Sequence, residues 1–340
     1  MIGQRTMGLR VLIINPSAEE APGLLLAPMI EAGCDVVELA SRAVVDLMVA
    51  KAHVTATVVD RFPPSSFGFD LLVVLGSPLG VLTGAGENAD DQTPRRAVAQ
   101  IEALIRDFHD RRKPVLGICL GSQLVARTFG GAVTPLPKDD AHTALPCDLA
   151  DPPKGLEFGW LPLDFSAAAA DDALVAAALE RWRGATPPTP LAPKFMQLHG
   201  DTFAPPPGAV LLATRPTCEN QAFRYGASTY AFQCHVEVDE DLSRAWFEEY
   251  VTGEDSFAEE ADWEPLEDAA DVAGMRAAHA AARDEGSILR AAAFTTAFAR
   301  GLLARAAANK RRRLSRRLGA AAAVAGVAAA VALGLRRAAR

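Results

Sequence analysis

The chain has 340 residues, of which 50% are apolar, and its formal net charge at pH 7 is -8. This length is enough to bury one large hydrophobic core or two smaller ones, and the apolar share excludes a globally disordered chain. The negative charge argues against nucleic-acid binding by the chain as a whole.

The cysteines predict a reducing environment. Their number is odd, and no pair has the spacing of zinc ligands, so we expect no structural metal. No signal-peptide pattern precedes the first apolar run, which predicts free thiols and a cytoplasmic protein. The five are Cys34, Cys119, Cys147, Cys218 and Cys234.

Short apolar runs alternate with helix-like stretches over the first 250 residues. In chain order we predict a strand at 9–15, a helix at 23–32, strands at 35–39 and 69–76, a helix at 94–109, a strand at 114–118 and a helix at 120–129. More β-rich segments follow at 195–198, 210–214, 221–225 and 229–235, before a helix at 239–251. This alternation predicts an α/β fold with a mostly parallel central sheet and helices on both faces.

The composition changes after residue 252. Residues 251–289 carry eleven acidic and two basic side chains, whereas residues 290–340 carry twelve basic and no acidic ones. We therefore predict a main domain at 1–252, an acidic linker at 253–289 and a basic, Ala-rich helical tail at 290–340 that is an appendage. Residues 318–335 are uncharged and flanked by arginines, so they are either a candidate membrane anchor or a soluble Ala-rich helix.

The segment Gly117-Ile-Cys-Leu-Gly121 lies between a predicted strand and a predicted helix. A G-x-C-x-G pattern in this place is typical of a nucleophile elbow, a sharp turn that lifts the side chain above the sheet edge. The glycines leave room for the turn, and the helix N-terminus favours the thiolate of Cys119. The backbone N–H of Leu120 is placed to stabilise an oxyanion. The pattern alone is equally compatible with a buried structural cysteine.

A thiol that attacks an amide needs a histidine to move its proton. Of the six histidines, His53, His109 and His279 lie in helix-like or polar stretches and are predicted to be surface residues, and His142 lies in a predicted loop. Of the remaining two, His199 and His235, the latter ends a predicted strand, and Glu237 two residues later projects on the same side. Its carboxylate could orient the imidazole, although a surface ion pair would give the same H-x-E pattern.

Three segments together resemble the class I glutamine amidotransferases. They are 117–123 (GICLGSQ), 198–201 (LHGD) and 232–237 (FQCHVE), in the order and at separations similar to those of the family. The resemblance covers roughly residues 9–251, is nearest to the amidotransferase domain of GMP synthase, and implies a flavodoxin-like fold. Residues 155–163 (GLEFGWLPL) also resemble a Glu-x-Gly-Trp element of that subfamily.

The resemblance implies a role for each matching residue. Cys119 would form a γ-glutamyl thioester, and His235 and Glu237 would complete the triad. His199 would be a structural member of the 198–201 turn rather than a base.

The resemblance also implies which residues hold the substrate. Glutamine would be bound by Gln123, Leu198, Gly200 and Asp201, partly through backbone atoms. The oxyanion would meet the backbone N–H groups of Leu120 and Ser77, where Ser77 replaces a glycine common in the family. No metal or other cofactor is implied.

The leading hypothesis is therefore a glutaminase that delivers ammonia to an acceptor. No phosphate-binding loop and no second catalytic domain are visible in the sequence, so either a separate synthetase receives the ammonia or the domain acts alone. The same triad would serve a γ-glutamyl peptidase or hydrolase, because both reactions form the same thioester. A catalytically silent amidotransferase-like regulator is the third hypothesis.

Overall fold

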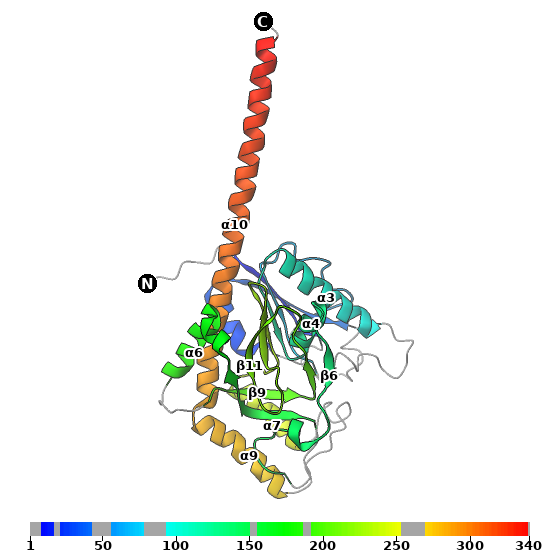
Figure 1. Cartoon of the computed structure of the whole chain (residues 1–340), viewed down its shortest axis with the longest axis vertical. Helices are drawn as coiled ribbons and strands as arrows, with labels where there is room; N and C mark the ends of the chain where they lie inside the picture. The colour runs from blue at the N-terminus through cyan, green and yellow to red at the C-terminus, as the bar shows by residue number, and fades with distance from the viewer. Residues whose placement is uncertain are drawn as a thin grey trace.

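The computed structural model describes residues 8–16, 21–42, 56–77, 93–149, 155–185, 192–252 and 269–338. Within these ranges the chain folds around a 9-stranded sheet in the order β3-β2-β1-β4-β5-β13-β12-β11-β8 (Figure 1). From β3 to β13 all neighbouring strands are parallel, and from β13 to β8 they are antiparallel. The strands of this sheet are β1 (Arg10–Ile14), β2 (Asp35–Ser41), β3 (Thr57–Val59), β4 (Leu71–Val74), β5 (Val115–Ile118), β8 (Asp164–Phe165), β11 (Val210–Thr214), β12 (Ala222–Tyr225) and β13 (Thr229–Phe232).

Two small antiparallel sheets lie beside the large one. One pairs β7 (Glu157–Pro162) with β9 (Lys194–His199), and the other pairs β6 (Val133–Pro135) with β10 (Asp201–Phe203). Since β9 leads into β10 through Gly200, the segment 198–201 connects the two small sheets.

The sheet is covered by helices on both faces because its strand side chains alternate between two cores. On β1, Val11 and Ile13 belong to one hydrophobic cluster, whereas Leu12 and Ile14 belong to the other. The first cluster includes side chains of α1, α6 and α10, and the second includes side chains of α3 and α4. The predicted fold class is therefore confirmed.

The helices and short 3-10 turns complete the fold. They are η1 (Gly23–Leu25), α1 (Leu26–Glu31), α3 (Thr93–Asp110), α4 (Leu120–Thr128), η2 (Asp140–His142), α5 (Ala167–Asp171), α6 (Ala173–Gly184), α7 (Glu240–Thr252), α9 (Ala269–Asp284) and α10 (Ser287–Ala338). The predicted strand and helix positions agree with these bounds to within a few residues, with one exception. The last predicted strand ends at Phe232 rather than at residue 235, because the chain turns there.

The first half of α10 is part of the main core, which differs from our expectation of an appendage. Phe294 and Phe298 are almost fully buried, and both rings lie against Phe232 of β13 at centroid distances of 6.3 and 5.3 Å. Helix α10 also crosses the predicted boundary at residue 290 without a break. This packing is explained by apolar side chains on the face of α10 that meets α6 and the sheet. The average composition of the segment is basic and does not show this apolar face.

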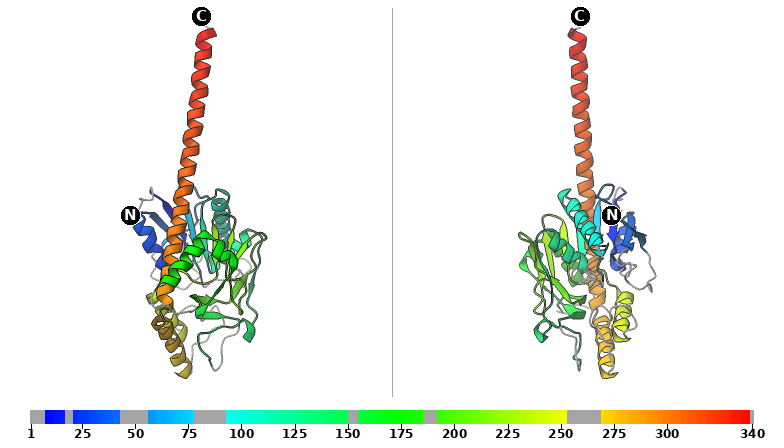
Figure 2. Two further views of the ribbon diagram at one scale, coloured as in Figure 1. Left: turned by 60° about the vertical axis from the view of Figure 1, so that its left-hand side comes forward. Right: turned by 90° about the vertical axis from the view of Figure 1, so that its right-hand side faces the viewer.

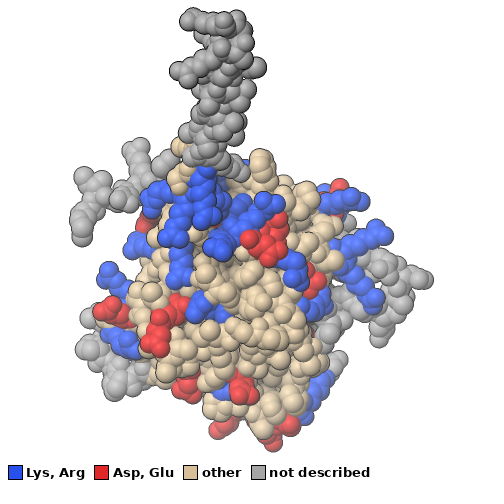
Figure 3. Space-filling view, turned by 45° about the horizontal axis from the view of Figure 1, so that its top comes forward, with Lys and Arg blue, Asp and Glu red and all other residues tan. Residues whose placement is uncertain are grey.

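The second half of α10 extends beyond the body of the protein (Figures 1 and 2). Lys and Arg side chains gather where it leaves (Figure 3), and two of them, Lys310 and Arg313, bind the buried Asp70 at 2.9 and 2.7 Å. Among the described residues, no helix combines the length and apolarity needed to cross a membrane. The candidate anchor at 318–335 lies almost entirely outside the described side chains, so it stays a prediction.

Candidate active site

Cys119 occupies the turn between β5 and α4. Its backbone has φ 50° and ψ -114°, a positive φ that side chains with a Cβ rarely adopt, and it is the N-cap of α4. Its N–H donates to the carbonyl oxygen of Phe232 on β13 at 2.8 Å. The sequence pattern therefore folds into a strand-elbow-helix unit at the carboxyl end of a central parallel strand.

The glycines on each side of the elbow are required by close packing. A Cβ on Gly117 would overlap the carbonyl oxygen of Gly121, and a Cβ on Gly121 would overlap the carbonyl oxygen of Val74 on β4. The first turn of α4 thus lies directly against both β5 and β4. This contact is the physical reason for the G-x-C-x-G spacing.

The side chain of Cys119 is 7% exposed and has three polar neighbours. Its Sγ lies 3.8 Å from the carbonyl oxygen of Leu198 and 3.8 Å from Nε2 of Gln233. The charge of Cys119 also acts on the His235 side chain, since it is one of the two charges that raise the pKa of that imidazole. The thiol of the elbow therefore lies near the predicted base.

His235 lies between Cys119 and a carboxylate. Its Nδ1 is 2.6 Å from Oε1 of Glu237, and Trp246 packs edge-to-face on the ring at 4.7 Å. Burial disfavours the charged imidazole, but the charges of Glu237 and Cys119 outweigh it and raise the pKa of His235 well above its usual value. The arrangement favours the protonated imidazolium of His235.

The contact between His235 and Glu237 is made in a turn rather than in an extended strand as we predicted. The turn is held by backbone bonds from two other elements. The N–H of His235 donates to the carbonyl oxygen of Met196 on β9, and the N–H of Leu24 donates to that of Glu237, each at 2.8 Å. Packing from distant parts of the chain sets this geometry.

The predicted substrate residues lie around the same centre. Gln123 on α4 is 3% exposed, and its Nε2 is 3.4 Å from the carbonyl oxygen of Asp201 and 3.4 Å from Oε1 of Gln233. The carbonyl oxygen of Gly200 accepts a bond from the N–H of Leu136 at 2.7 Å, which anchors the 198–201 segment. Burial raises the pKa of the Asp201 carboxyl.

The predicted oxyanion donors are placed less completely. Leu120 is the first residue of α4 and is buried. Ser77 follows β4, whose end contacts the first turn of α4 through Val74 and Gly121. Residues 78–80, which follow Ser77 in the sequence, lie outside the described ranges.

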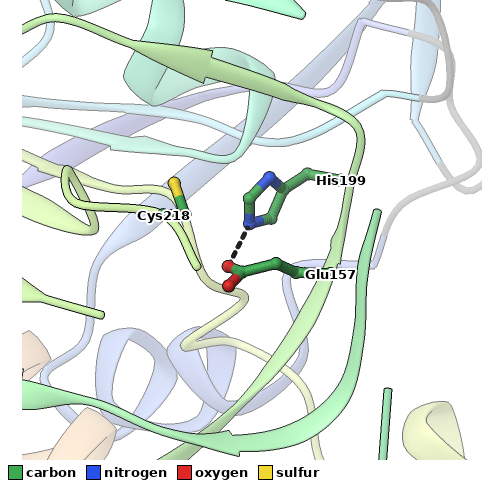
Figure 4. A group of neighbouring side chains, drawn as sticks. All are labelled: Glu157, His199 and Cys218. Carbon is green, nitrogen blue, oxygen red and sulfur yellow. Dashed lines mark hydrogen bonds and ion pairs between the residues drawn. The ribbon is translucent and has the colours of Figure 1, made fainter. Parts of the chain in front are cut away.

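The side chain of His199 makes hydrogen bonds that hold the 198–201 segment in place, and Figure 4 shows the one to Glu157. Its Nδ1 lies 2.9 Å from the carbonyl oxygen of Asp201, and its Nε2 lies 3.1 Å from Oε2 of Glu157 on β7. Each ring nitrogen of His199 therefore faces a hydrogen-bond acceptor. Sequence reasoning found Glu157 only as part of a Glu-x-Gly-Trp resemblance and assigned it no contact.

The carboxylate of Glu157 has several other donors. Gln221 donates at 2.6 Å, the guanidinium of Arg215 lies at 3.0 Å, and the hydroxyl of Thr217 also donates. Burial alone would raise the pKa of Glu157, but His199, Thr217 and Arg215 lower it below its usual value. Glu157 therefore stays ionised despite its burial.

Among the described residues, Glu157, His199 and Cys218 form one group that could hold a metal ion, with ligand atoms within 4.8 Å of one another (Figure 4). The donors around Glu157 already occupy its oxygens, and the Arg215 guanidinium repels a cation. Burial and the charge of Glu157 also raise the pKa of Cys218 to about 11, which opposes thiolate ligation. The donor set therefore suits a hydrogen-bond network better than a metal.

The remaining histidines and cysteines lie away from the elbow or are inert. All five cysteines are free, and burial, followed by the charge of Glu237, raises the pKa of Cys234 well above its usual value. Our surface prediction for His109 is wrong, because its half-buried ring packs at tilted angles against both Phe129 and Tyr225. His279 is likewise half-buried, against Phe247. His142 lies in η2 and pairs with Asp139 at 2.7 Å, and His53 lies outside the described ranges.

Comparison with known proteins shows a matching family. The model of the class-I glutamine amidotransferase family matches residues 75–247, just over half of the chain. A glutamine amidotransferase-like protein of Salmonella typhimurium is 28% identical over 178 residues, or 52% of this chain and 61% of that protein. The glutamine amidotransferase-like protein chyE of Penicillium rubens is 25% identical over 187 residues, or 55% of this chain and 63% of that protein. The matches thus span less than two thirds of either relative.

Solved structures with similar folds include two glutamine amidotransferases. One from Thermotoga maritima has a TM-score of 0.52 and 21% identity, covering 85% of this chain and 98% of its own. One from Methylobacillus flagellatus has a TM-score of 0.51 and 23% identity, covering 89% of this chain and 94% of its own. At these low identities, the similarity to the two solved structures concerns the fold alone.

Proposed function

This chain belongs to the class-I glutamine amidotransferase family, and from that membership we propose that it hydrolyses the side-chain amide of glutamine. Cys119 is the nucleophile, His235 is its base, and Glu237 orients the base. The observation that carries the proposal is the position of the His235 ring, whose Nδ1 lies 2.6 Å from Oε1 of Glu237 and whose pKa is raised by the charges of Glu237 and of the nearby Cys119.

The proposed reaction proceeds through an acyl-enzyme. The Cys119 thiolate attacks the amide carbon, and the resulting oxyanion is stabilised by the backbone N–H groups of Leu120 and Ser77. As the C–N bond breaks, the His235 imidazolium gives its proton to the departing ammonia. A water molecule then loses a proton to His235 and attacks the γ-glutamyl thioester, which releases glutamate and restores the thiol.

The substrate site of this proposal lies beside the sulfur. Gln123 and the 198–201 segment hold the amino-acid end of glutamine, and the hydrogen bond between His199 and Glu157 supports that segment. The distance of 3.8 Å between the Cys119 Sγ and the Leu198 carbonyl oxygen supports this assignment, because it brings the segment to the nucleophile.

An ammonia-release assay tests the proposal. We expect wild type and Cys34→Ala to release ammonia from glutamine and Cys119→Ala to be inactive, since Cys34 immediately precedes the amino end of β2, whereas Cys119 follows the carboxyl end of the parallel strand β5. Ammonia release that persists in Cys119→Ala would refute the assigned nucleophile. Cleavage of γ-glutamyl peptides by a wild type that ignores glutamine would favour the peptidase instead.

We propose that the ammonia passes to an acceptor on a separate synthetase, because the family to which the chain belongs consists of amidotransferases and a transfer needs an acceptor. Co-purification of wild-type protein with such a partner, followed by glutamine-dependent amidation, tests this. Glutaminase activity with no associated partner at any stage of purification would count against it.

We also propose, from the sequence, that residues 318–335 contact a membrane. The basic side chains at the base of the projecting helix support this, because they suit anionic lipid (Figure 3). Fractionation should compare full-length protein with a chain cut after Arg317, since an earlier cut would remove core residues of α10 such as Phe298. Equal solubility of both would contradict the proposal.

A further inference from the structure

The turn that carries His235 and Glu237 receives a hydrogen bond from the C-terminal helix. The hydroxyl of Thr295 on α10 donates to the carbonyl oxygen of Val236 at 2.6 Å. Val236 stands between the two residues, so this bond acts on the peptide that joins them. Thr295 lies outside residues 75–247, which match the family.

Regular structure does not hold this turn. Strand β13 ends at Phe232, and helix α7 begins only at Glu240. The backbone bonds from β9 and η1 fix the N–H of His235 and the carbonyl of Glu237. The Val236 carbonyl between them is fixed by a side chain, that of Thr295.

The surroundings of Thr295 make its hydroxyl hard to replace. The residue is fully buried, so water is not at hand to satisfy the Val236 carbonyl if the hydroxyl is removed. Its neighbours Phe294 and Phe298 pack against Phe232, which fixes α10 to the strand end from which the turn emerges. The helix therefore presents the hydroxyl from a rigid position.

We propose that Thr295 is a positioning residue, which holds the His235–Glu237 turn so that the imidazole meets Cys119. Helix α10 thereby supports the active site from behind, although its sequence looks like a tail. This inference rests on the proposed function for its kinetic consequence. The geometric consequence, the contact between His235 and Cys119, is measurable without turnover.

The test uses the full chain with three substitutions. Thr295→Val keeps the shape and removes the hydroxyl, Thr295→Ser restores it, and Thr296→Val is the matched control at the partly exposed neighbouring position. The pH dependence of Cys119 alkylation by iodoacetamide reports the imidazole–thiol contact, with Cys119→Ala giving the background from other cysteines. The charged groups that act on His235 are Glu237 and Cys119 itself.

We expect the alkylation profile of Thr295→Val to move toward that of an ordinary thiol, and its kcat for glutamine to fall by about 10- to 100-fold, with a smaller change in KM. Thr295→Ser should restore both, and Thr296→Val should match wild type. If Thr295→Val does not fold by circular dichroism, Thr295→Ala carries the same comparison.

Two results overturn the inference. One is a Thr295→Val profile and kcat indistinguishable from those of Thr296→Val, and the other is a Thr295→Ser variant as impaired as Thr295→Val. If wild type releases no ammonia but Thr295→Val still shifts the alkylation profile, the positioning role stands and the proposed function fails.

Discussion

The backbone of Cys119 allows a prediction that inverts the usual order of two substitutions. A protein with alanine at a given position is normally more stable than one with glycine there by about 0.5–1 kcal/mol, because glycine loses more backbone freedom on folding. At φ 50° and ψ -114°, however, a residue with a Cβ is strained, at a cost of roughly 1–3 kcal/mol. Glycine avoids this strain, so Cys119→Gly should be more stable than Cys119→Ala by about 1 kcal/mol.

Equilibrium unfolding in urea measures the difference. Both variants lack the sulfur and its contacts, so the loss of the thiol cancels between them. The matched control is Ala126→Gly in the buried interior of α4, where the ordinary order applies and a loss of about 1 kcal/mol is expected. An alanine variant at Cys119 as stable as the glycine variant, or more so, would refute the claim that the elbow is strained.

Three further predictions concern the supports of the site. Phe298→Ala should lower the free energy of unfolding by about 3–5 kcal/mol, whereas Leu289→Ala, at a 58% exposed position of the same helix, should change it by less than about 0.5; equal effects in urea titrations would exclude α10 from the core. Gly121→Ala should destabilise by about 3 kcal/mol, because its Cβ would overlap a carbonyl oxygen of β4, and an unchanged thermal midpoint would contradict this packing. Glu237→Gln removes a charge that raises the pKa of His235. Protonation of His235 in the folded state stabilises the wild-type fold fully below about pH 6.5, and this stabilisation is lost as pH rises through the raised pKa of His235. The difference in unfolding free energy between wild type and Glu237→Gln should therefore shrink toward alkaline pH, and a difference that grows would refute the sign.

The positions of the elbow and of most strands were predictable because they depend on local rules. Alternating apolar runs set the strands of a sheet covered on both faces, and the glycines around Cys119 mark a turn with no room for side chains. The pairing of His235 with Glu237 was also expected, but for the wrong local reason. The spacing of two residues places side chains together in a strand, whereas here a turn held from β9, η1 and α10 does so.

The amino-acid sequence by itself determined the α/β class, the elbow and the family to which the motifs point, since each is predicted from short segments whose patterns are local. Tertiary structure alone decided the contacts of Glu157 and Thr295, which lie 42 and 59 residues from the partners that they bind. It also decided that the first half of α10 is core rather than tail. A helix's buried face is defined by what packs against it, and composition averaged along a basic segment does not record that face.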